Sequence, residues 1–454
     1  MTTTVFKGDS RPVRSVGDLV AMFRAGEKKR EAWRIGTEHE KIGFYRDSRL
    51  PVPYEGPRGI RAILEGFAER FGWEPILEGP NLIALKRGQA SITLEPGGQV
   101  ELSGAALSST HEVCAELAQH LREIETISAP FGVVWLALGR NPFIAREEMP
   151  WVPKQRYQIM REYLPGRGTM GLDMMVSTGT VQTNFDYANE ADMAKKLRVA
   201  LAATPALIAL FANSPFAAGR PTGYLSSREL IWSNTDPDRC GLVPGALNEG
   251  FGYHSYAEYA LGVPMFFIHR GGRYVHYAGR SFREFMARGF DGYHATEEDW
   301  ALHLTTIFPE VRVKTYLELR MADAGPREMI CALAAITRGL FYDQTSLDDA
   351  LHLLRDVKAA DFQPGVDAAS RWGLDGDLLG RPLREWARDL AAIADAGLKR
   401  LNVVNSMGQD ERIFLAPLET ILQSGKSRAR VLMELWAGAW NQSLDPLFTQ
   451  SYFH

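Results

Sequence analysis

The chain has 454 residues, of which 45% are hydrophobic and 23% are charged, and its formal net charge is −4. This composition is typical of a soluble globular protein, and it gives no basic footprint for nucleic acid. No apolar run has the length of a membrane span, three cysteines are too few for a secreted disulfide scaffold, and the first residues lack an apolar signal core. We therefore expect a cytoplasmic protein with no nucleic-acid or membrane partner.

The predicted elements mix helices and strands up to about residue 325 and are helical thereafter. In chain order we predict helices at 16–29, 59–71 and 109–127, strands at 132–138 and 173–186, a helix at 191–211, and strands at 265–270, 274–277 and 318–320. Helices follow at 327–341, 346–356, 383–401, 417–423 and 428–440. Because strands and helices do not alternate strictly, an α+β fold with an antiparallel sheet is favoured over a doubly wound one.

Three of the expected strands carry carboxylates where apolar residues would be expected. Glu38 and Glu40 share one face of the first strand, because side chains alternate across a strand. Glu95 precedes a Pro-Gly-Gly bend, and Glu101 follows it on the next stretch of strand. Glu318 lies on the third strand. The acidic residues are thus spread over segments that are far apart in the sequence.

Buried carboxylates on neighbouring strands repel one another and are costly to remove from water. Divalent cations are the usual remedy, and ligation by oxygen alone selects the hard ions Mg²⁺ or Mn²⁺ over zinc or copper. One Glu-x-Glu pair would fit the outer face of an ordinary strand equally well. Three such strands together favour a metal–phosphate site.

Two segments look like nucleotide-binding motifs but lack the required context. Residues 166–171 match G-x-G-x-x-G, yet they follow Tyr-Leu-Pro and lead into an expected strand at 172–176, the reverse of the dinucleotide fingerprint. We interpret them as a flexible loop. The stretch 424–427 (Ser-Gly-Lys-Ser) lacks the first glycine of a P-loop and a preceding strand, so we expect a connection between helices. ATP, if used, is held without a P-loop.

Ordered blocks over residues 33–448 carry a family resemblance. They lie at 35–41, 94–104, 153–160, 171–175, 180–184, 210–215, 227–232 and 305–312, and the strand with Glu318 and Arg320 completes them. In these blocks the chain resembles the glutamate–cysteine ligases (γ-glutamylcysteine synthetases) of plants and many proteobacteria. The resemblance implies a glutamine-synthetase-like α+β fold, in which an antiparallel sheet forms a half-open funnel backed by helices. It implies one catalytic domain over 1–454, with a sheet core at about 32–325 and a mainly helical part at about 326–454.

The resemblance also implies a reaction. In it the γ-carboxyl of L-glutamate is joined to L-cysteine through γ-glutamyl phosphate, with ATP as co-substrate and ADP and phosphate as products, as the first step of glutathione biosynthesis. The expected partners are therefore the small molecules glutamate, cysteine and ATP, with Mg²⁺ or Mn²⁺ as cofactor. The implied metal ligands are Glu38, Glu40, Glu95, Glu101 and Glu318.

Arg320 shares a strand face with Glu318, and these two residues are the predicted catalytic pair. The guanidinium of Arg320 is suited to stabilising phosphate charge, although a salt bridge that organises the glutamates is the alternative. Gln182 and Asn184 share one face of another strand and are predicted to contact ATP or its phosphates. For Gln182, a structural hydrogen-bonding role is the alternative.

A glutamate substrate needs its α-carboxylate held, and the guanidinium fork of arginine suits this. Arg156 and Arg228 are the candidates that the family resemblance supplies. Trp232 and Tyr157 are expected to wall the same pocket, although core packing is the commoner role of aromatic side chains.

The cysteines allow two interpretations. Cys114 and Cys331 lie on predicted helices, so in a reducing cytosol they would be buried small hydrophobes. Their flanking segments, however, resemble those joined by a disulfide in this ligase group, where the bond is tied to dimer formation. The resemblance thus implies a Cys114–Cys331 bond, a free Cys240, and a monomer or redox-dependent homodimer. The cysteine pair that plant members carry near a hairpin is missing at 274–289, and no plastid transit segment is apparent, so we expect a bacterial cytosolic enzyme.

Two rival functions remain open at this point. One is another carboxylate–amine ligase of the same superfamily that uses a different amine. The other is a non-catalytic metal- or nucleotide-binding regulator descended from such an enzyme. The retained glutamates argue against the regulator, because a degenerate site would not need this unfavourable cluster of charge.

Overall fold

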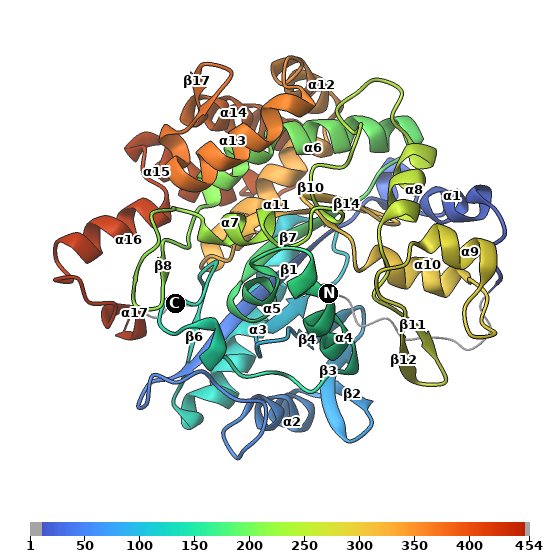
Figure 1. The fold of residues 1–454 in the computed structure, drawn as a ribbon. Helices are drawn as coiled ribbons and strands as arrows, with labels where there is room; N and C mark the ends of the chain where they lie inside the picture. The colour runs from blue at the N-terminus through green and yellow to red at the C-terminus, as the bar shows by residue number, and fades with distance from the viewer. Residues whose placement is uncertain (1–10, 450–454) are drawn as a thin grey trace.

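A computed structural model describes residues 11–449, and its centre is one large antiparallel sheet with helices packed around it (Figure 1). The first residues, in which we noted the missing signal core, lie outside the described range. The strands follow the spatial order β14-β15-β7-β1-β5-β4-β3-β2, with β6 paired to the far end of β1. Their bounds are β1 Ile35–Tyr45, β2 Glu74–Glu78, β3 Asn81–Arg87, β4 Ala90–Leu94, β5 Val100–Ser103, β6 Val133–Leu136, β7 Thr180–Phe185, β14 Val311–Val313 and β15 Leu317–Asp323.

Four two-stranded sheets lie outside the large one. They are β8 Phe216–Ala217 with β9 Arg220–Pro221, β10 Cys240–Gly241 with β13 Phe308–Pro309, β11 Phe267–Arg270 with β12 Arg273–His276, and β16 Asp377–Leu378 with β17 Arg381–Pro382. The helices are α1 Val16–Arg24, α2 Ile60–Phe71, α3 Thr110–Ser128, α4 Gln155–Tyr163, α5 Gly171–Ser177, α6 Glu190–Phe211, α7 Ser227–Ser233, α8 Tyr253–Gly262, α9 Phe282–Arg288, α10 Glu297–Leu304, α11 Arg327–Phe341, α12 Gln344–Leu353, α13 Ala359–Trp372, α14 Leu383–Leu401, α15 Ala416–Ser424, α16 Arg428–Ala437 and α17 Pro446–Thr449.

One face of the sheet is covered by helices α3, α6 and α11, which pack against β1, β7 and β15. Strand β15 shows how the sequence sorts its side chains between the two faces. Leu317, Leu319 and Met321 belong to the same apolar core as α6 and α11, so Glu318 and Arg320 point to the opposite face. The expected α+β fold, an open antiparallel sheet backed by helices, is therefore confirmed.

The helical C-terminal part begins at α11, directly after β15, and its helices α12, α13 and α14 pack next to α6 (Figure 1). Helices α11 and α14 approach each other very closely, because glycines lie at their contact. A Cβ atom on Gly397 would lie 2.1 Å from the carbonyl oxygen of Gly339. No larger residue fits at this crossing.

The segment after Gly171 was predicted wrongly. Residues 172–176 were expected to form a strand, but they belong to helix α5, and the strand β7 begins only at Thr180. A short apolar run does not distinguish a buried strand from a buried helix, and the Leu and Met residues of this run favour a helix. Residues 164–166 before it form a 3₁₀ turn rather than a strand, so the dinucleotide fingerprint is still not met. Residues 424–427 do connect two helices, α15 and α16.

Helices α3 and α11 are joined behind the sheet by a disulfide between Cys114 and Cys331, whose Cα atoms lie 5.8 Å apart. Cys240 is a free thiol. A buried ion pair adds a second link to α11: the guanidinium of Arg338 on this helix lies 3.0 Å from the carboxylate of Glu411. The same carboxylate accepts the N–H of Thr110 at the start of α3. The two helices are thus held by a covalent and a polar link.

Because the disulfide closes a loop with a sequence separation of 217, we expect its reduction to lower the free energy of unfolding by about 2–4 kcal/mol. Urea unfolding with and without reductant measures this. A Cys240→Ala variant is the control and should keep the full sensitivity to reductant. An unchanged midpoint in the reduced protein would show that the ion pair alone suffices.

Candidate functional site

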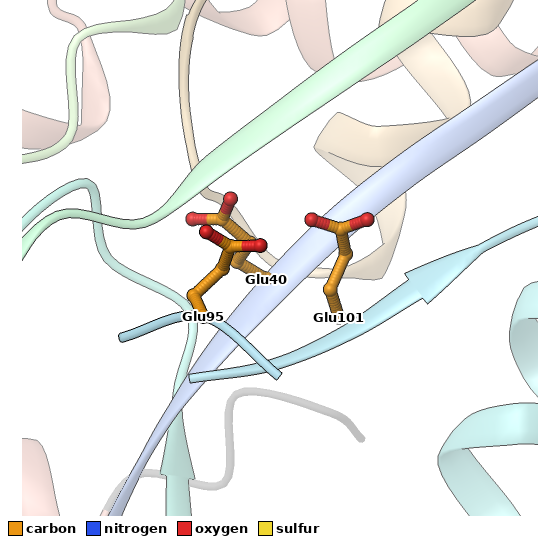
Figure 2. Close-up of side chains that lie close together, drawn as sticks. All are labelled: Glu40, Glu95 and Glu101. Carbon is orange, nitrogen blue, oxygen red and sulfur yellow. The ribbon is translucent and has the colours of Figure 1, made fainter. Parts of the chain in front are cut away.

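Glu40, Glu95 and Glu101 converge on the face of the sheet opposite the covering helices. One carboxylate oxygen of each lies within 4.8 Å of the others (Figure 2). Glu40 on β1 stands directly opposite Glu101 on β5, where side chains of an antiparallel pair are neighbours. Two contacts fix the cluster: the N–H of Thr180 donates to Glu40 at 3.1 Å, and the hydroxyl of Ser103 donates to Glu101 at 2.6 Å.

The Pro-Gly-Gly bend between β4 and β5 brings Glu95 into this cluster. Gly98 has a φ of +84°, a conformation that favours glycine. A Cβ atom on Gly97 would lie 2.4 Å from the carbonyl oxygen of Val176, so helix α5 packs directly on the bend. The side chain of Gln99 fastens the two together, because it accepts the N–H of Gly97 and donates to the carbonyl of Thr178, each at 2.9 Å.

Electrostatics makes this cluster unfavourable without a cation. Burial raises the pKa of Glu40 well above its ordinary value, and the charges of Glu95 and Glu101 raise it further, while Arg228 opposes the shift. Three carboxylates that can approach one position offer the all-oxygen ligation that Mg²⁺ and Mn²⁺ prefer. The residues present therefore fit the predicted metal ion.

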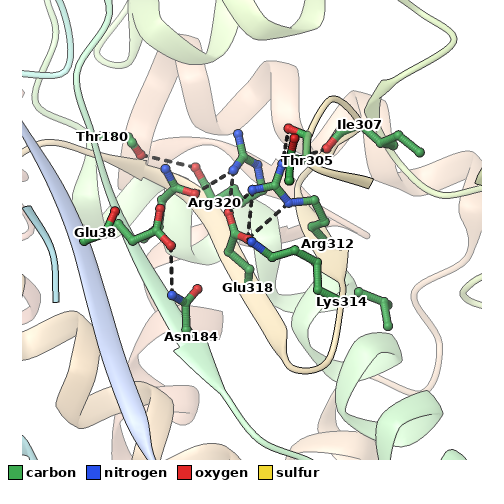
Figure 3. A network of polar contacts seen from close by, with 12 residues as sticks. Glu38, Thr180, Asn184, Thr305, Ile307, Arg312, Lys314, Glu318 and Arg320 are labelled. Carbon is green, nitrogen blue, oxygen red and sulfur yellow. Dashed lines mark hydrogen bonds and ion pairs between the residues drawn. The ribbon is translucent and has the colours of Figure 1, made fainter. Parts of the chain in front are cut away.

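Glu318 has a different environment, because three cations surround it (Figure 3). Its carboxylate lies 2.6 Å from Arg312, 2.9 Å from Lys314 and 2.5 Å from Arg320. Burial alone would raise the pKa of Glu318, but these three cations hold it well below its usual range. Arg312 also donates to the carbonyls of Thr305 and Ile307, so its guanidinium is fixed in place.

Strand β7 lies between β1, which carries Glu38 and Glu40, and β15, which carries Glu318 and Arg320, and it makes hydrogen bonds to both strands. Gln182 accepts a hydrogen bond from Arg320 at 2.6 Å, and Asn184 donates to Glu38 at 2.9 Å. The salt bridge and the amide contact that we considered as alternatives for Arg320 and Gln182 are thus both present. Glu38 and Glu318 lie outside the three-carboxylate cluster, and their roles as metal ligands stay predictions.

Two cavities open onto this face of the sheet. A small one of about 20 Å³ is lined by Glu40, Glu95, Gln182, Arg228, Trp232 and Arg320, among others. A second one of about 200 Å³ is lined by Glu38, Asn184, Ser103, Lys28, Arg34 and Tyr316, among others. Strand β7 contributes to both, because Gln182 faces the first and Asn184 the second. The site thus offers two compartments along one sheet.

The four residues predicted to bind glutamate separate into two pairs. Arg228 and Trp232, one turn apart on α7, line the small cavity. Within residues 11–449, Arg156 and Tyr157 line neither cavity. The hydroxyl of Tyr157 donates to the carbonyl of Leu94 at 2.5 Å, which supports the strand just before Glu95. The guanidinium of Arg156 lies 5.3 Å from the ring centre of Phe267 on β11.

Several charged residues of the site were not among the predicted ones. Arg312 lies on β14, which pairs with the strand of Glu318, and Lys314 directly follows β14. The alternation of charged and apolar residues over 310–314 is a signal that could have placed both side chains on one face. Glu310 is held beside Arg320, whose N–H donates to the carbonyl of Glu310 at 3.0 Å. Glu229 follows Arg228 on α7, and no pattern in the sequence identifies it as a residue of the site.

Glu229 and Glu310 are both buried close to Arg228. Burial raises the pKa of each carboxyl above its ordinary value, and for Glu229 the charge of Glu310 adds to the rise. Arg228 opposes both shifts. The folded protein therefore keeps protons on these carboxyls up to a higher pH than the unfolded chain does.

The raised pKa of Glu229 predicts a pH-dependent loss of stability. A group whose pKa is raised on folding contributes stability that is fully present below its unfolded pKa, near 4.5, and is lost as pH rises through the folded pKa. Melting temperatures of the Glu229→Gln variant should therefore fall less steeply above pH 5 than those of the parent. The exposed Glu69→Gln serves as the control and should follow the parent. Parallel curves for Glu229→Gln and the parent would contradict the expected shift.

Comparisons with known proteins show the family to which the chain is similar. The family model for glutamate-cysteine ligase family 2 (GCS2) matches residues 34–450. The chain is 44% identical over 436 residues to a glutamate–cysteine ligase, chloroplastic, of Nicotiana tabacum, covering 95% of this chain and 82% of the relative. It is 43% identical to the chloroplastic enzyme of Arabidopsis thaliana, with the same coverage.

A crystal structure of glutamate–cysteine ligase from Francisella tularensis in complex with AMP shares the fold. The TM-score is 0.58 at 12% sequence identity, and the match covers 94% of this chain and 88% of that one. At this identity the likeness supports the fold alone.

The expected cytoplasmic location is contradicted by the relatives. Similar ligases of Nicotiana tabacum, Brassica juncea and Arabidopsis thaliana are named as chloroplastic proteins. The lack of an apolar signal core was a poor guide, because plastid transit segments are rich in Ser and Arg and have no such core. Among the helices over residues 11–449, we find none with the length and apolar character needed to cross a membrane.

The family assignment rests on nearly the whole chain. The matched region begins just before β1 and includes every strand of the carboxylate-bearing sheet. The chain belongs to glutamate-cysteine ligase family 2.

Proposed function

We propose that this chain joins the γ-carboxyl of L-glutamate to the amine of L-cysteine in an ATP-dependent reaction, the first step of glutathione biosynthesis. One observation carries the proposal: a single sheet face holds the cluster of Glu40, Glu95 and Glu101 beside the ion-paired Glu318 and Arg320. The chain that presents this face is 44% identical to a glutamate–cysteine ligase over 95% of its length.

The proposed chemistry explains why the site is so highly charged. A carboxylate is a poor acyl donor, and transfer of the γ-phosphoryl group of ATP to glutamate supplies a leaving group that the cysteine amine can displace. Glu40, Glu95 and Glu101 would hold Mg²⁺. The ion, when bound, neutralises charge on the phosphates.

The protein's own residues position the reactants. Arg228 and Trp232 line the small cavity, and the guanidinium fork of Arg228 suits the α-carboxylate of glutamate. Because about 20 Å³ holds only about one water, the walls of this cavity must move apart when glutamate binds. The larger compartment, bordered by Glu38 and Asn184, suits the nucleotide. Arg320 and Gln182 line the small cavity beside it, where an arginine can stabilise charge on the transferred phosphoryl group.

Arg320 is better placed for this role than the other two cations. Arg312 and Lys314 continue to neutralise Glu318 when Arg320 turns toward a phosphate. The salt bridge with Glu318 and a contact with phosphate are then successive states of one side chain. This reconciles the two interpretations of Arg320.

We further propose that the whole chain forms one catalytic domain. Its largest apolar core includes residues of β15 in the sheet part and of α11 and α14 in the helical part. The helical part therefore completes the core behind the catalytic face and is not expected to fold separately.

The reaction is tested by ADP release from ATP and Mg²⁺ with the purified protein. We expect release that requires both glutamate and cysteine, with γ-glutamylcysteine as the product. 2-Aminobutyrate and glycine serve as comparison amines. A preference for another amine would retain the mechanism and replace the named product. Lack of turnover with every amine would favour the regulator.

Glu40→Gln should lower turnover by roughly 100-fold or more while leaving the metal-free protein as stable as the parent or more stable. Removal of one like charge relieves the repulsion from Glu95 and Glu101 but removes a metal ligand. Activity, and melting temperature with and without Mg²⁺, measure both effects. The surface variant Glu69→Gln should change neither. Near-normal turnover of Glu40→Gln with unchanged Mg²⁺ dependence would remove Glu40 from the metal site.

A further inference from the structure

Asp323 is a buried carboxylate at the end of β15 that has no part in the proposed chemistry. Its exposed fraction is 2%, and three donors converge on it. The N–H of Asn213 and the hydroxyl of Ser214 donate to one oxygen, each at 2.7 Å, and the hydroxyl of Ser226 donates to the other at 2.8 Å. Asp323 thus ties the strand of Glu318 and Arg320 to the segment after α6 and to the start of α7.

These donors determine where α7 begins. Ser226 is the N-cap of the helix, and its side chain accepts the N–H of Glu229 at 3.3 Å. Ser214 accepts the N–H of Arg228 at 3.1 Å through the same hydroxyl that donates to Asp323. Asp323 therefore holds both hydroxyls that fix the first turn of α7, and this turn carries Arg228.

The side chain of Arg228 returns to the strand on which Asp323 lies. Its guanidinium donates to the carbonyl of Arg320 at 2.8 Å and to that of Met321 at 3.3 Å. Trp232 lies one turn further along α7 and lines the same small cavity. A shift of α7 relative to β15 would thus move Arg228 and Trp232 together, away from the strand that carries Arg320.

The backbone of Gly139 packs directly against the carboxylate of Asp323. A Cβ atom on Gly139 would lie 2.4 Å from the carboxyl carbon of Asp323, so any side chain there would displace it. The backbone of Gly139 is itself fixed, because its N–H donates to the carbonyl of Asn213 at 3.1 Å. Gly139 and Asn213 thus hold Asp323 from two sides.

We infer that Asp323 is the positioning residue for Arg228: it docks the start of α7 on β15 and thereby sets the affinity of the site for glutamate. The inference rests on the proposed function, in which Arg228 binds the glutamate carboxylate. The metal cluster is held by β1, β5, the bend before β5 and the N–H of Thr180, whereas the hydrogen bonds of the Asp323 side chain go to Asn213, Ser214 and Ser226. We therefore expect the contribution of the cluster to ATP binding to depend little on the Asp323 side chain.

Asp323→Asn tests the inference, because the amide keeps the shape of the carboxylate but loses acceptor capacity. We expect the glutamate KM to rise about tenfold, with kcat and the ATP KM changed less than threefold. A double-mutant cycle with Arg228→Lys is the sharper measurement. If Asp323 acts through Arg228, the double variant should be no worse for glutamate than Arg228→Lys alone. Equal rises in both KM values, or additive effects in the cycle, would overturn the inference.

Gly139→Ala perturbs the same carboxylate by steric displacement without changing its chemistry. It should reproduce the selective rise in glutamate KM, and it keeps the inference testable if Asp323→Asn does not fold. The matched control is Asp236→Asn: Asp236 is equally buried, and its carboxylate lies 2.6 Å from Arg239. That variant should lose stability without a selective effect on glutamate.

Glutamate binding without turnover separates this inference from the proposed function. Glutamate should raise the melting temperature of the parent protein, and less so that of Asp323→Asn. If the parent uses glutamate and Asp323→Asn binds it normally, the positioning role alone fails. If the parent neither turns over nor binds glutamate, the proposed function and the inference both fail.

Discussion

Repulsion between buried carboxylates is the constraint on which the rest of this structure depends. The antiparallel register places Glu40 opposite Glu101 and the bend adds Glu95, so three like charges meet in a region of low polarity. Such an arrangement persists only where the surrounding structure leaves the side chains no alternative. The bend fastened by Gln99 and the contact from Thr180 have this effect.

The negative charge of Glu318 on β15 and that of the Glu40–Glu95–Glu101 cluster are balanced in different ways. On the β15 side, Arg312, Lys314 and Arg320 neutralise Glu318 within the protein. On the β1 side, burial and the neighbouring carboxylates keep the pKa of Glu40 raised although the charge of Arg228 opposes the rise. Slippage of one residue in either strand pair would turn these side chains into the apolar layer of α6 and α11. Those helices, with α3 joined to α11 by the disulfide and the ion pair, pack on the face that a slipped strand would turn its charged side chains toward.

How far the sequence could predict this arrangement depends on the range of the interactions involved. Helices α11 and α14 begin and end where their amphipathic pattern predicted, and alternation placed Glu318 and Arg320 on one face. These features depend on local periodicity. The helix at Gly171–Ser177 was wrongly predicted because a short apolar run has no distinguishing period. The grouping of Glu40 with Glu95 and Glu101 but not Glu38, the cations around Glu318 and the separation of Arg156 from Arg228 all depend on contacts between distant segments.

The pKa values of Glu318 and Glu40 shift in opposite directions, and this difference bears on function. Glu318 stays ionised because its counter-charges are part of the protein, whereas burial and its neighbours raise the pKa of Glu40. A divalent cation at Glu40, Glu95 and Glu101 would favour the ionised form of Glu40 that burial disfavours, so metal affinity and protonation would be coupled there. Such an ion would relieve the repulsion among the three carboxylates, so its binding would also stabilise the folded sheet. The charge of Glu318 is thus balanced by residues of the protein, whereas the charge of the three-carboxylate cluster would be balanced further by the proposed metal ion.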